Sequence, residues 1–471
     1  MVNPIIYKDA STLAREIRAQ NLSAVEVMNA FLEQIARVNP EVNAICTLDE
    51  SGARASAESA DRSLLSGKPV GPLHGLPVAI KDLHATRGMR TTHGSPFFEN
   101  HVPDFDHLHV ARLRQAGAIV IGKTNTPEFG AGSQTFNAVF GTTRNPYDLN
   151  TTCGGSSGGA AVAIATGMLP IADGSDMGGS LRNPAAFCNV FGFRPSPGRV
   201  PDWPVANNTR RLGVRGPIAR SARDIALIMS AIAGPDERVP LSIDEPGTVF
   251  SQPLERDFAG TRVAWSPNLG QYEVDEEIIE VCEQALAHFE AAGCEVIRRD
   301  PDMHEADEIF QTLRAHSFAF DHRDRYANHK SQLKDTIIWN VEQGLALTGP
   351  DVARAEAQCT TLFERTVSFF EDVEFLLCPT TQVLPFSHEL DWIREINGVP
   401  MKTYIDWMGL CYAITVTGCP AISVPVGFSS GGLPVGMQIV ARPKADFSAL
   451  QLAHAVEQHC DAKSHRPGVA I

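Results

Sequence analysis

Apolar and polar positions recur along this chain with two different periods, and each period predicts a different kind of element. Ser23, three residues before Glu26, opens a stretch in which apolar residues return every three or four positions, which predicts a capped amphipathic helix. Short apolar runs at 78–81, 118–121 and 169–172 predict buried strands. Because such runs alternate with helical patterns, we predict an α/β fold: a large twisted, mixed, mostly parallel sheet with helices on both faces.

Composition separates regions within the chain, but we expect one domain over residues 1–471. The glycine- and serine-rich motifs gather between about 70 and 200, which we interpret as the core of the functional site. Residues 305–375 contain few glycines and have a mostly helical pattern, and we expect these helices to shape a pocket.

Two glycine-flanked serines, 24 positions apart, carry the candidate chemistry: Ser156 within 154–159 and Ser180 within 176–182. Glycine permits positive φ and lets backbone amides approach a ligand closely. Amides arranged in this way can form an oxyanion hole, and the candidate donors are those of Met177, Gly178, Gly179 and Ser180.

A serine hydroxyl needs a nearby base before it can attack a carbonyl carbon. The candidate base is Lys81, which ends an apolar strand-like run and is therefore carried into the interior. Burial disfavours the charged form of an amine and lowers its pKa, as a general base at neutral pH requires.

The three motifs around Lys81, Ser156 and Ser180 resemble those of the amidase signature family, in the family's order and spacing. The resemblance extends from Tyr7 to Glu457. It implies a single-domain fold with a Ser–cis-Ser–Lys triad, in which the peptide bond before Ser156 is cis.

The resemblance also implies roles. Lys81 takes a proton from Ser156, which takes one from Ser180, and Ser180 attacks the carbonyl carbon to form an acyl-enzyme. Ser157 supports the site by hydrogen bonding. Exchange of the roles of Ser156 and Ser157 remains an alternative, although the offset of 24 residues to Ser180 favours Ser156.

Further residues are assigned from their positions near the motifs. Arg182 resembles a characteristic family arginine, and we expect it to pair with a carboxylate such as Asp176 rather than to act in catalysis. The family reads malonate-like acids with an arginine at the position of Asn183, so a malonyl substrate is not expected. Candidate substrate-binding residues are Phe129, Gln134, Phe136, Asn183, Trp339, Tyr404 and Trp407.

The chain departs from the common family pattern beside the motifs. Ser175 and Met177 replace frequent residues while keeping their backbone amides, so we expect them to affect pocket shape rather than mechanism. Asp173 is polar where the family commonly has an apolar residue, and the sequence assigns it no role.

Charge and cysteine usage limit the class of protein. The net charge of −15 disfavours nucleic acid and anionic membranes as partners. The ten cysteines are scattered, which is typical of a reducing compartment. We also find no signal-peptide pattern at the start and no apolar run of about 18 residues, so we expect a cytoplasmic protein without a membrane span.

No cofactor or metal is expected. Residues 117–124 match the spacing of a phosphate-binding loop, but their middle positions form an apolar strand-like run. Asp104, Asp106, His107 and His109 lie close together in sequence, and we interpret them as polar residues around a helix start.

The predicted function is hydrolysis of a carboxylic amide, with ester or aryl-carbamate (urethane) hydrolysis as a side activity. The expected partners are a small-molecule amide and water, and a homodimer is among the assembly states left open. Two alternatives remain: the glutaminase (A) subunit of a tRNA-dependent amidotransferase, and a catalytically silent binding protein on the same fold.

Overall fold

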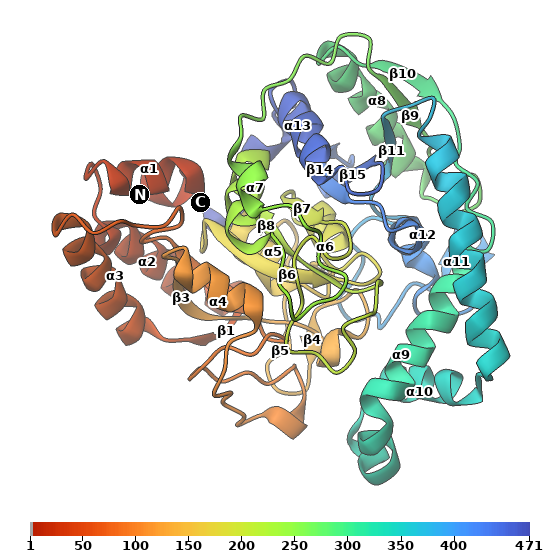
Figure 1. Ribbon diagram of the computed structural model, residues 1–471, viewed down its shortest axis with the longest axis horizontal. Coiled ribbons are helices and arrows are strands. Elements are labelled where there is room, and N and C mark those ends of the chain that lie inside the picture. The colour runs from red at the N-terminus through yellow and green to blue at the C-terminus, as the bar shows by residue number, and fades with distance from the viewer. Residues whose placement is uncertain (1–2) are drawn as a thin grey trace.

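One long sheet runs through the molecule and organises it (Figure 1). The computed structural model describes residues 3–471. The strands of the sheet are β1 (Ile45–Leu48), β2 (Pro77–Lys81), β3 (Ile119–Thr124), β6 (Ile171–Asp176), β7 (Phe191–Arg194), β8 (Val214–Ala219), β9 (Arg262–Trp265), β10 (Glu295–Arg298), β11 (Phe375–Pro379), β14 (Ala421–Phe428) and β15 (Pro434–Ala441). Within the described range these eleven strands lie in the order β1-β3-β2-β6-β8-β7-β14-β15-β11-β9-β10.

The predicted α/β class and mixed sheet are confirmed, but the prediction of a mostly parallel sheet is wrong. Parallel pairs are β2 with β3, β2 with β6, β9 with β10 and β9 with β11. The other six pairings in this sheet are antiparallel, including the hairpin of β14 and β15. An apolar run indicates that a strand is buried on both faces, but it does not indicate the direction of its neighbours. In this sheet the central antiparallel strands are buried as completely as the parallel ones.

Helices cover both faces of the sheet. They are α1 (Ala10–Arg18), α2 (Ala24–Val42), α3 (Glu50–Leu65), α4 (Leu108–Gln115), α5 (Gly158–Ala165), α6 (Arg182–Phe187), α7 (Ala222–Ile232), α8 (Glu276–Ala291), α9 (Ala306–His329), α10 (Asp335–Ala346), α11 (Gly349–Phe369), α12 (Gly409–Thr417) and α13 (Asp446–Glu457). Ser23 and Glu26 form the predicted capping box at the start of α2. None of the helices within residues 3–471 combines the length and the apolar character needed to cross a bilayer.

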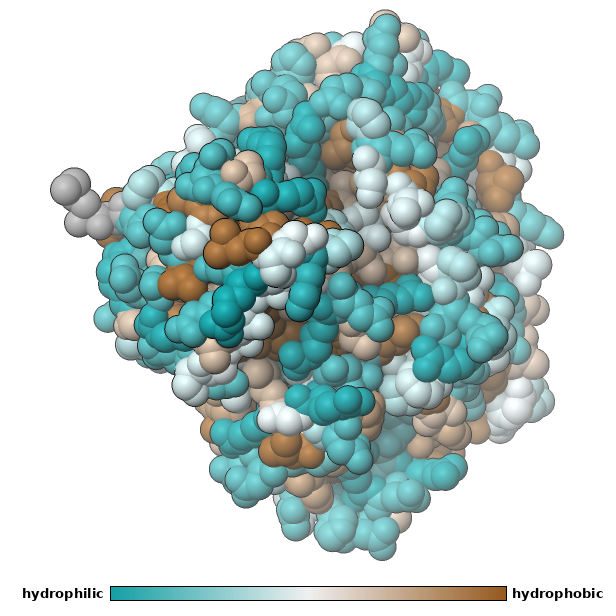
Figure 2. Space-filling model, turned by 60° about the vertical axis from the view of Figure 1, so that its left-hand side comes forward, coloured by the Kyte–Doolittle hydropathy of each residue, from teal (hydrophilic) through white to brown (hydrophobic). Residues whose placement is uncertain are grey.

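Alternate residues of the same strand feed two separate apolar cores. Val78 and Ile80 of β2 belong to the larger core, while Ala79 between them belongs to the second core, which α5 enters. Since successive side chains of a strand point to opposite faces, the sheet separates the two cores. Figure 2 shows one face of the molecule that is largely hydrophilic, with smaller separate hydrophobic areas, as expected where the cores are covered.

Two strands and one helix occupy segments for which the sequence predicted no element. β7 and β8 form between 191 and 219, and α6 follows Ser180. These strands contain glycine and proline, which usually interrupt strands, so the sequence pattern does not indicate them. Gly216 is needed because a Cβ at that position would lie 2.3 Å from the carbonyl oxygen of Phe193.

Helices α9, α10 and α11 form an arm at one side of the sheet, as Figure 1 shows. Helices α9 and α10 pack along each other, and α11 packs against α9. These helices fall within the region 305–375 that was predicted to be helical. The small two-stranded pairs β4 (Phe136–Asn137) with β5 (Gly141–Thr142) and β12 (Glu395–Ile396) with β13 (Val399–Pro400) lie outside the main sheet.

Candidate active site

Lys81 is the last residue of β2 and is completely buried. Its Nζ lies 2.8 Å from Oγ of Ser156, 2.9 Å from Oγ of Ser157 and 3.1 Å from Oγ of Ser175. Burial lowers the pKa of Lys81 to about 7, against the pull of nearby acidic groups. A neutral amine has two N–H bonds and one lone pair, so it can satisfy three surrounding hydroxyls.

The loop that carries Ser156 is fixed from the side by two hydroxyl groups. Ser133 donates to the carbonyl of Gly155 at 2.7 Å, and Thr135 donates to the carbonyl of Gly154 at 2.9 Å. The peptide bond between Gly155 and Ser156 is cis, as the resemblance implied. Ser156 is 3% exposed, so the chain holds this hydroxyl inside the protein next to the lysine.

The turn after β6 positions Ser180, and Asp176 folds this turn. Its carboxylate accepts the amide of Gly179 at 2.9 Å and the amide of Leu181 at 3.1 Å. Of the predicted oxyanion-hole donors, the Gly179 amide is therefore already engaged by a side chain. Among the described residues, the amides of Met177, Gly178 and Ser180 have no internal acceptor.

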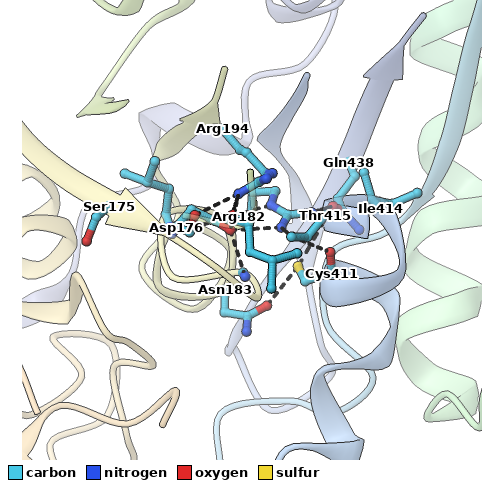
Figure 3. Close-up of polar contacts among 12 residues, drawn as sticks. Ser175, Asp176, Arg182, Asn183, Arg194, Cys411, Ile414, Thr415 and Gln438 are labelled. Atoms are coloured by element: carbon cyan, nitrogen blue, oxygen red, sulfur yellow. Dashed lines mark hydrogen bonds and ion pairs between the residues drawn. The ribbon is translucent and has the colours of Figure 1, made fainter. Parts of the chain in front are cut away.

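Two buried arginines converge on Asp176 from α6 and β7 (Figure 3). Arg182 donates Nε and Nη2 to the two carboxylate oxygens at 3.0 Å each, which is the pairing predicted from the sequence. Arg194 reaches Oδ1 at 3.2 Å and the Asp176 carbonyl at 2.7 Å. Burial alone would raise the pKa of Asp176, but the arginines hold it well below its usual range. Arg182 also donates to Gln438 and to Thr415, which ties the turn to β15 and α12.

Ser180 is partly exposed, unlike Ser156. Its carbonyl accepts the amide of Ser157 at 3.1 Å, which joins the two serine loops. The hydrogen bonds among the described residues include none between the Ser156 and Ser180 hydroxyls. The structure therefore brings Lys81 and Ser156 into direct contact and places Ser180 on the outer side of the same loops.

The candidate substrate-binding residues divide into two groups. Phe129 and Phe136 are partly exposed, and Trp339 packs edge-on against Tyr404 with ring centroids 5.7 Å apart. Three others are engaged or enclosed: Gln134 donates to the Leu390 carbonyl, Asn183 donates to Ser133, and Trp407 is 1% exposed between Phe187 and Phe386. The prediction that Trp407 lines the pocket is wrong, because its indole is part of the main core.

An apolar cluster from the helical arm borders the site. Phe129 and Met177 pack against it, and a Cβ at Gly178 would lie 2.7 Å from Cζ of Phe310 on α9. The buried members of the cluster are Ala131, Phe318, Leu333, Ile337 and Val341. The sequence placed a helical region here, but it did not single out these residues, because their periodicity is that of any amphipathic helix.

A polar cluster behind Lys81 was also not foreseen. Asp173 on β6 accepts the Lys81 backbone amide at 2.6 Å and is joined by His84 and His109. These three side chains are the one group among the described residues with enough closely spaced histidine, cysteine or carboxylate ligands to hold a metal ion. Asp104 and Asp106, which the sequence placed near His109, are not part of it.

Comparison with known proteins gives consistent matches along the whole chain. A family model described as Amidase matches residues 26–450. An acylamidase of Rhodococcus erythropolis is 36% identical over 464 residues, covering 97% of each chain, and the A subunit of the glutamyl-tRNA(Gln) amidotransferase from Marinomonas sp. is 31% identical over 485 residues, covering 98% of each. Among solved structures, a bacterial aryl acylamidase of the amidase signature enzymes aligns with a TM-score of 0.91 at 28% identity over 99% of this chain and 100% of its own. A peptide amidase from Stenotrophomonas maltophilia aligns at 0.82 and 28% over 98% and 99%.

Proposed function

This chain belongs to the amidase signature family and hydrolyses amide C–N bonds, and from that premise we propose that it does so through an acyl-enzyme on Ser180. The observation that carries the proposal is the 2.8 Å contact between the buried Lys81 amine and the Ser156 hydroxyl. An amine with a pKa of about 7 is half neutral at that pH and can accept a proton there.

The proton moves in two transfers. Neutral Lys81 takes the proton of Ser156, and the Ser156 oxygen takes the proton of Ser180 as the Ser180 hydroxyl turns inward on substrate binding. Catalytic hydrogen bonds are often long in the free enzyme and shorten in the substrate complex. Ser180 Oγ then bonds to the carbonyl carbon, the C–N bond breaks, and the relay returns a proton to the leaving amine. Water hydrolyses the resulting ester along the same path.

The free amides of Met177, Gly178 and Ser180 stabilise the oxyanion in this proposal. Each preorganised donor is worth roughly 3 kcal/mol of transition-state stabilisation. Asp176 contributes by accepting the Gly179 amide, which fixes the turn and leaves the neighbouring amides without an acceptor among the described residues. The arginine pairs keep this carboxylate in place.

We propose that the substrate is a neutral amide with an apolar acyl or aryl part. The support is the apolar cluster of the helical arm, which reaches Met177 of the oxyanion turn. The relatives described as acylamidase and aryl acylamidase favour the same class. Phe129 and Phe136 remain the proposed contacts, with ester and aryl-carbamate hydrolysis as side activities because their tetrahedral intermediates are alike.

The amidotransferase relatives favour a second candidate, a glutaminase component that works in a complex. A protein that is active as purified, without partner proteins, on an anilide and inactive on glutamine supports the amidase. We also propose a cytoplasmic location, which the ten unpaired cysteines support, with a homodimer or a monomer as the assembly state.

The test combines two substitutions with a panel of substrates. Ser180→Ala and Lys81→Ala are each expected to remove turnover, and a fluorophosphonate should label the wild type but not Ser180→Ala. The panel comprises anilides, aliphatic amides and carbamates compared by kcat/KM. Retention of turnover by Ser180→Ala would overturn the acyl-enzyme, and retention by Lys81→Ala would overturn the base.

A further inference from the structure

Asp173, His84 and His109 form a buried polar cluster directly behind the candidate base. The Asp173 carboxylate accepts the backbone amide of Lys81 at 2.6 Å through Oδ1. Its other oxygen faces His84 Nδ1 at 2.5 Å and His109 Nε2 at 3.1 Å. All three side chains are at most 1% exposed, so this carboxylate is solvated by protein N–H groups alone.

The cluster matches a hydrogen-bonded carboxylate better than a metal site. Two ligands of a tetrahedral ion with bonds of about 2.1 Å stand about 3.4 Å apart, whereas Asp173 and His84 approach to 2.5 Å. A metal-bound histidine also donates its second nitrogen to an acceptor. Here the outer nitrogens, Nε2 of His84 and Nδ1 of His109, have no partner among the described residues.

The protonation states follow from these contacts. Burial alone would raise the pKa of Asp173, but the histidine donors hold it well below its usual range. Burial lowers the pKa of His84, so this ring is neutral and gives its N–H to the carboxylate. The result is a fixed negative charge without a lysine or arginine ion-pair partner among the described residues.

We propose that Asp173, held by His84 and His109, is a positioning group for Lys81. Its carboxylate fixes the end of β2, and its negative charge stabilises the protonated form of the Lys81 amine. The inference rests on the proposed role of Lys81 as the base. The other charged groups around this lysine are Arg215 on β8 and Asp176, while Lys123 on β3 interacts with Asp82 and Asp173.

The direction of the effect is determined by charge. Asp173 favours the ammonium form of Lys81 and thereby limits how far burial lowers the pKa of this amine. Replacing Asp173 by Asn removes the charge and keeps an oxygen for the Lys81 amide. The acid limb of kcat/KM is then expected to move to lower pH by on the order of one pH unit.

The experiment compares pH profiles of kcat/KM on a neutral anilide for wild type and Asp173→Asn, between pH 5 and 9. A matched control is Asp446→Asn, because Asp446 is also fully buried and accepts a backbone amide, from Ser196 at 2.7 Å. The control is expected to lose stability without moving the limb, since Asp446 is not among the groups around Lys81.

A second pair of variants keeps the test decisive if Asp173→Asn does not fold. His84→Leu removes one donor, leaves the carboxylate less compensated, and is expected to move the limb to higher pH. His84→Asn places an amide N–H near the position of Nδ1 and is expected to restore the wild-type profile. Opposite shifts for Asp173→Asn and His84→Leu support the proposal.

Three results would overturn it. Unchanged limbs in Asp173→Asn and His84→Leu, with Lys81→Ala inactive, reduce the cluster to a structural role while the proposed function stands. One equivalent of metal in the purified protein, measured by mass spectrometry and lost in Asp173→Asn, makes the cluster a metal site. If Lys81→Ala remains active, the proposed function fails first and the inference fails with it.

Discussion

Two carboxylates three residues apart on β6 are stabilised in opposite ways. Asp176 is paired with two arginines, at 3.0 Å and 3.2 Å, whereas Asp173 is held by two histidines and one backbone amide. Since side chains alternate along a strand, the two groups leave β6 on opposite faces. Both pKa values are held well below the usual range, so both groups are ionised at neutral pH.

The difference lies in where each negative charge acts. Around Asp176 the positive partners are in contact, so its field is largely cancelled and its contribution is geometric: it folds the turn that carries Ser180. Around Asp173 no lysine or arginine of the described residues forms an ion pair, so its charge remains to act on Lys81. Buried ion pairs therefore specify shape at one end of β6, while an uncompensated charge adjusts protonation at the other.

The largest expected effect comes from removing the carboxylate of Asp176. Asp176→Ala leaves Arg182 and Arg194 buried without a carboxylate, and breaking a buried pair in this way costs about 3–5 kcal/mol. We expect a corresponding loss in urea-unfolding free energy and a loss of turnover beyond a hundredfold, since the oxyanion turn loses its fold. An Asp176→Ala protein with wild-type stability would contradict the assignment of this pair.

Arg182→Lys tests whether the two-point geometry of the pair matters. Lysine keeps the charge but cannot donate to both oxygens of Asp176 and also reach Gln438 and Thr415. We expect a loss of about 2 kcal/mol in the free energy of unfolding, with an unchanged acid limb of kcat/KM. A shifted limb would show that Asp176, like Asp173, acts on the base through its charge.

The pH dependence of the wild type measures the pKa of Lys81, the group on which Asp173 acts. Lys81 must be neutral to act, and its pKa is lowered to about 7, so kcat/KM is expected to rise through pH 7 and to fall about tenfold per unit below it. Initial rates on a neutral anilide, measured after confirming that the protein stays folded at each pH, give the midpoint. A midpoint near 10 would mean that burial does not adjust this lysine.

The smallest expected effect is that of a chelator. If Asp173, His84 and His109 are joined by hydrogen bonds, incubation with EDTA followed by desalting should leave kcat/KM within experimental error and the melting temperature unchanged. The matched sample is the same protein desalted without chelator. A drop in melting temperature that is reversed by added zinc would show that Asp173, His84 and His109 hold a metal ion, and the contrast with Asp176 would no longer apply.

Sequence alone predicted the catalytic motifs because glycine, serine and lysine stand there in a dense local pattern. The βαβ unit of β9, α8 and β10 is equally local, because its two parallel strands are joined by a single helix. The contact between His84 and Asp173 was missed because 89 positions separate the two residues and only the fold joins them. The occupied amide of Gly179 could not be foreseen either, because it depends on how Asp176 folds the turn.

The helical arm has a consequence for protein engineering. The chain enters α9 after β10 and returns from α11 into β11, and both strands pair with β9. Because β10, β9 and β11 run parallel, the chain leaves β10 at one end of the strands and enters β11 at the other, so the arm is the crossover between two strands that stand about 10 Å apart across the sheet. An arm inserted as one continuous crossover suits modular exchange: the segment 306–369 could be swapped among homologous scaffolds to generate new selectivities while the reactive lysine and serines stay untouched.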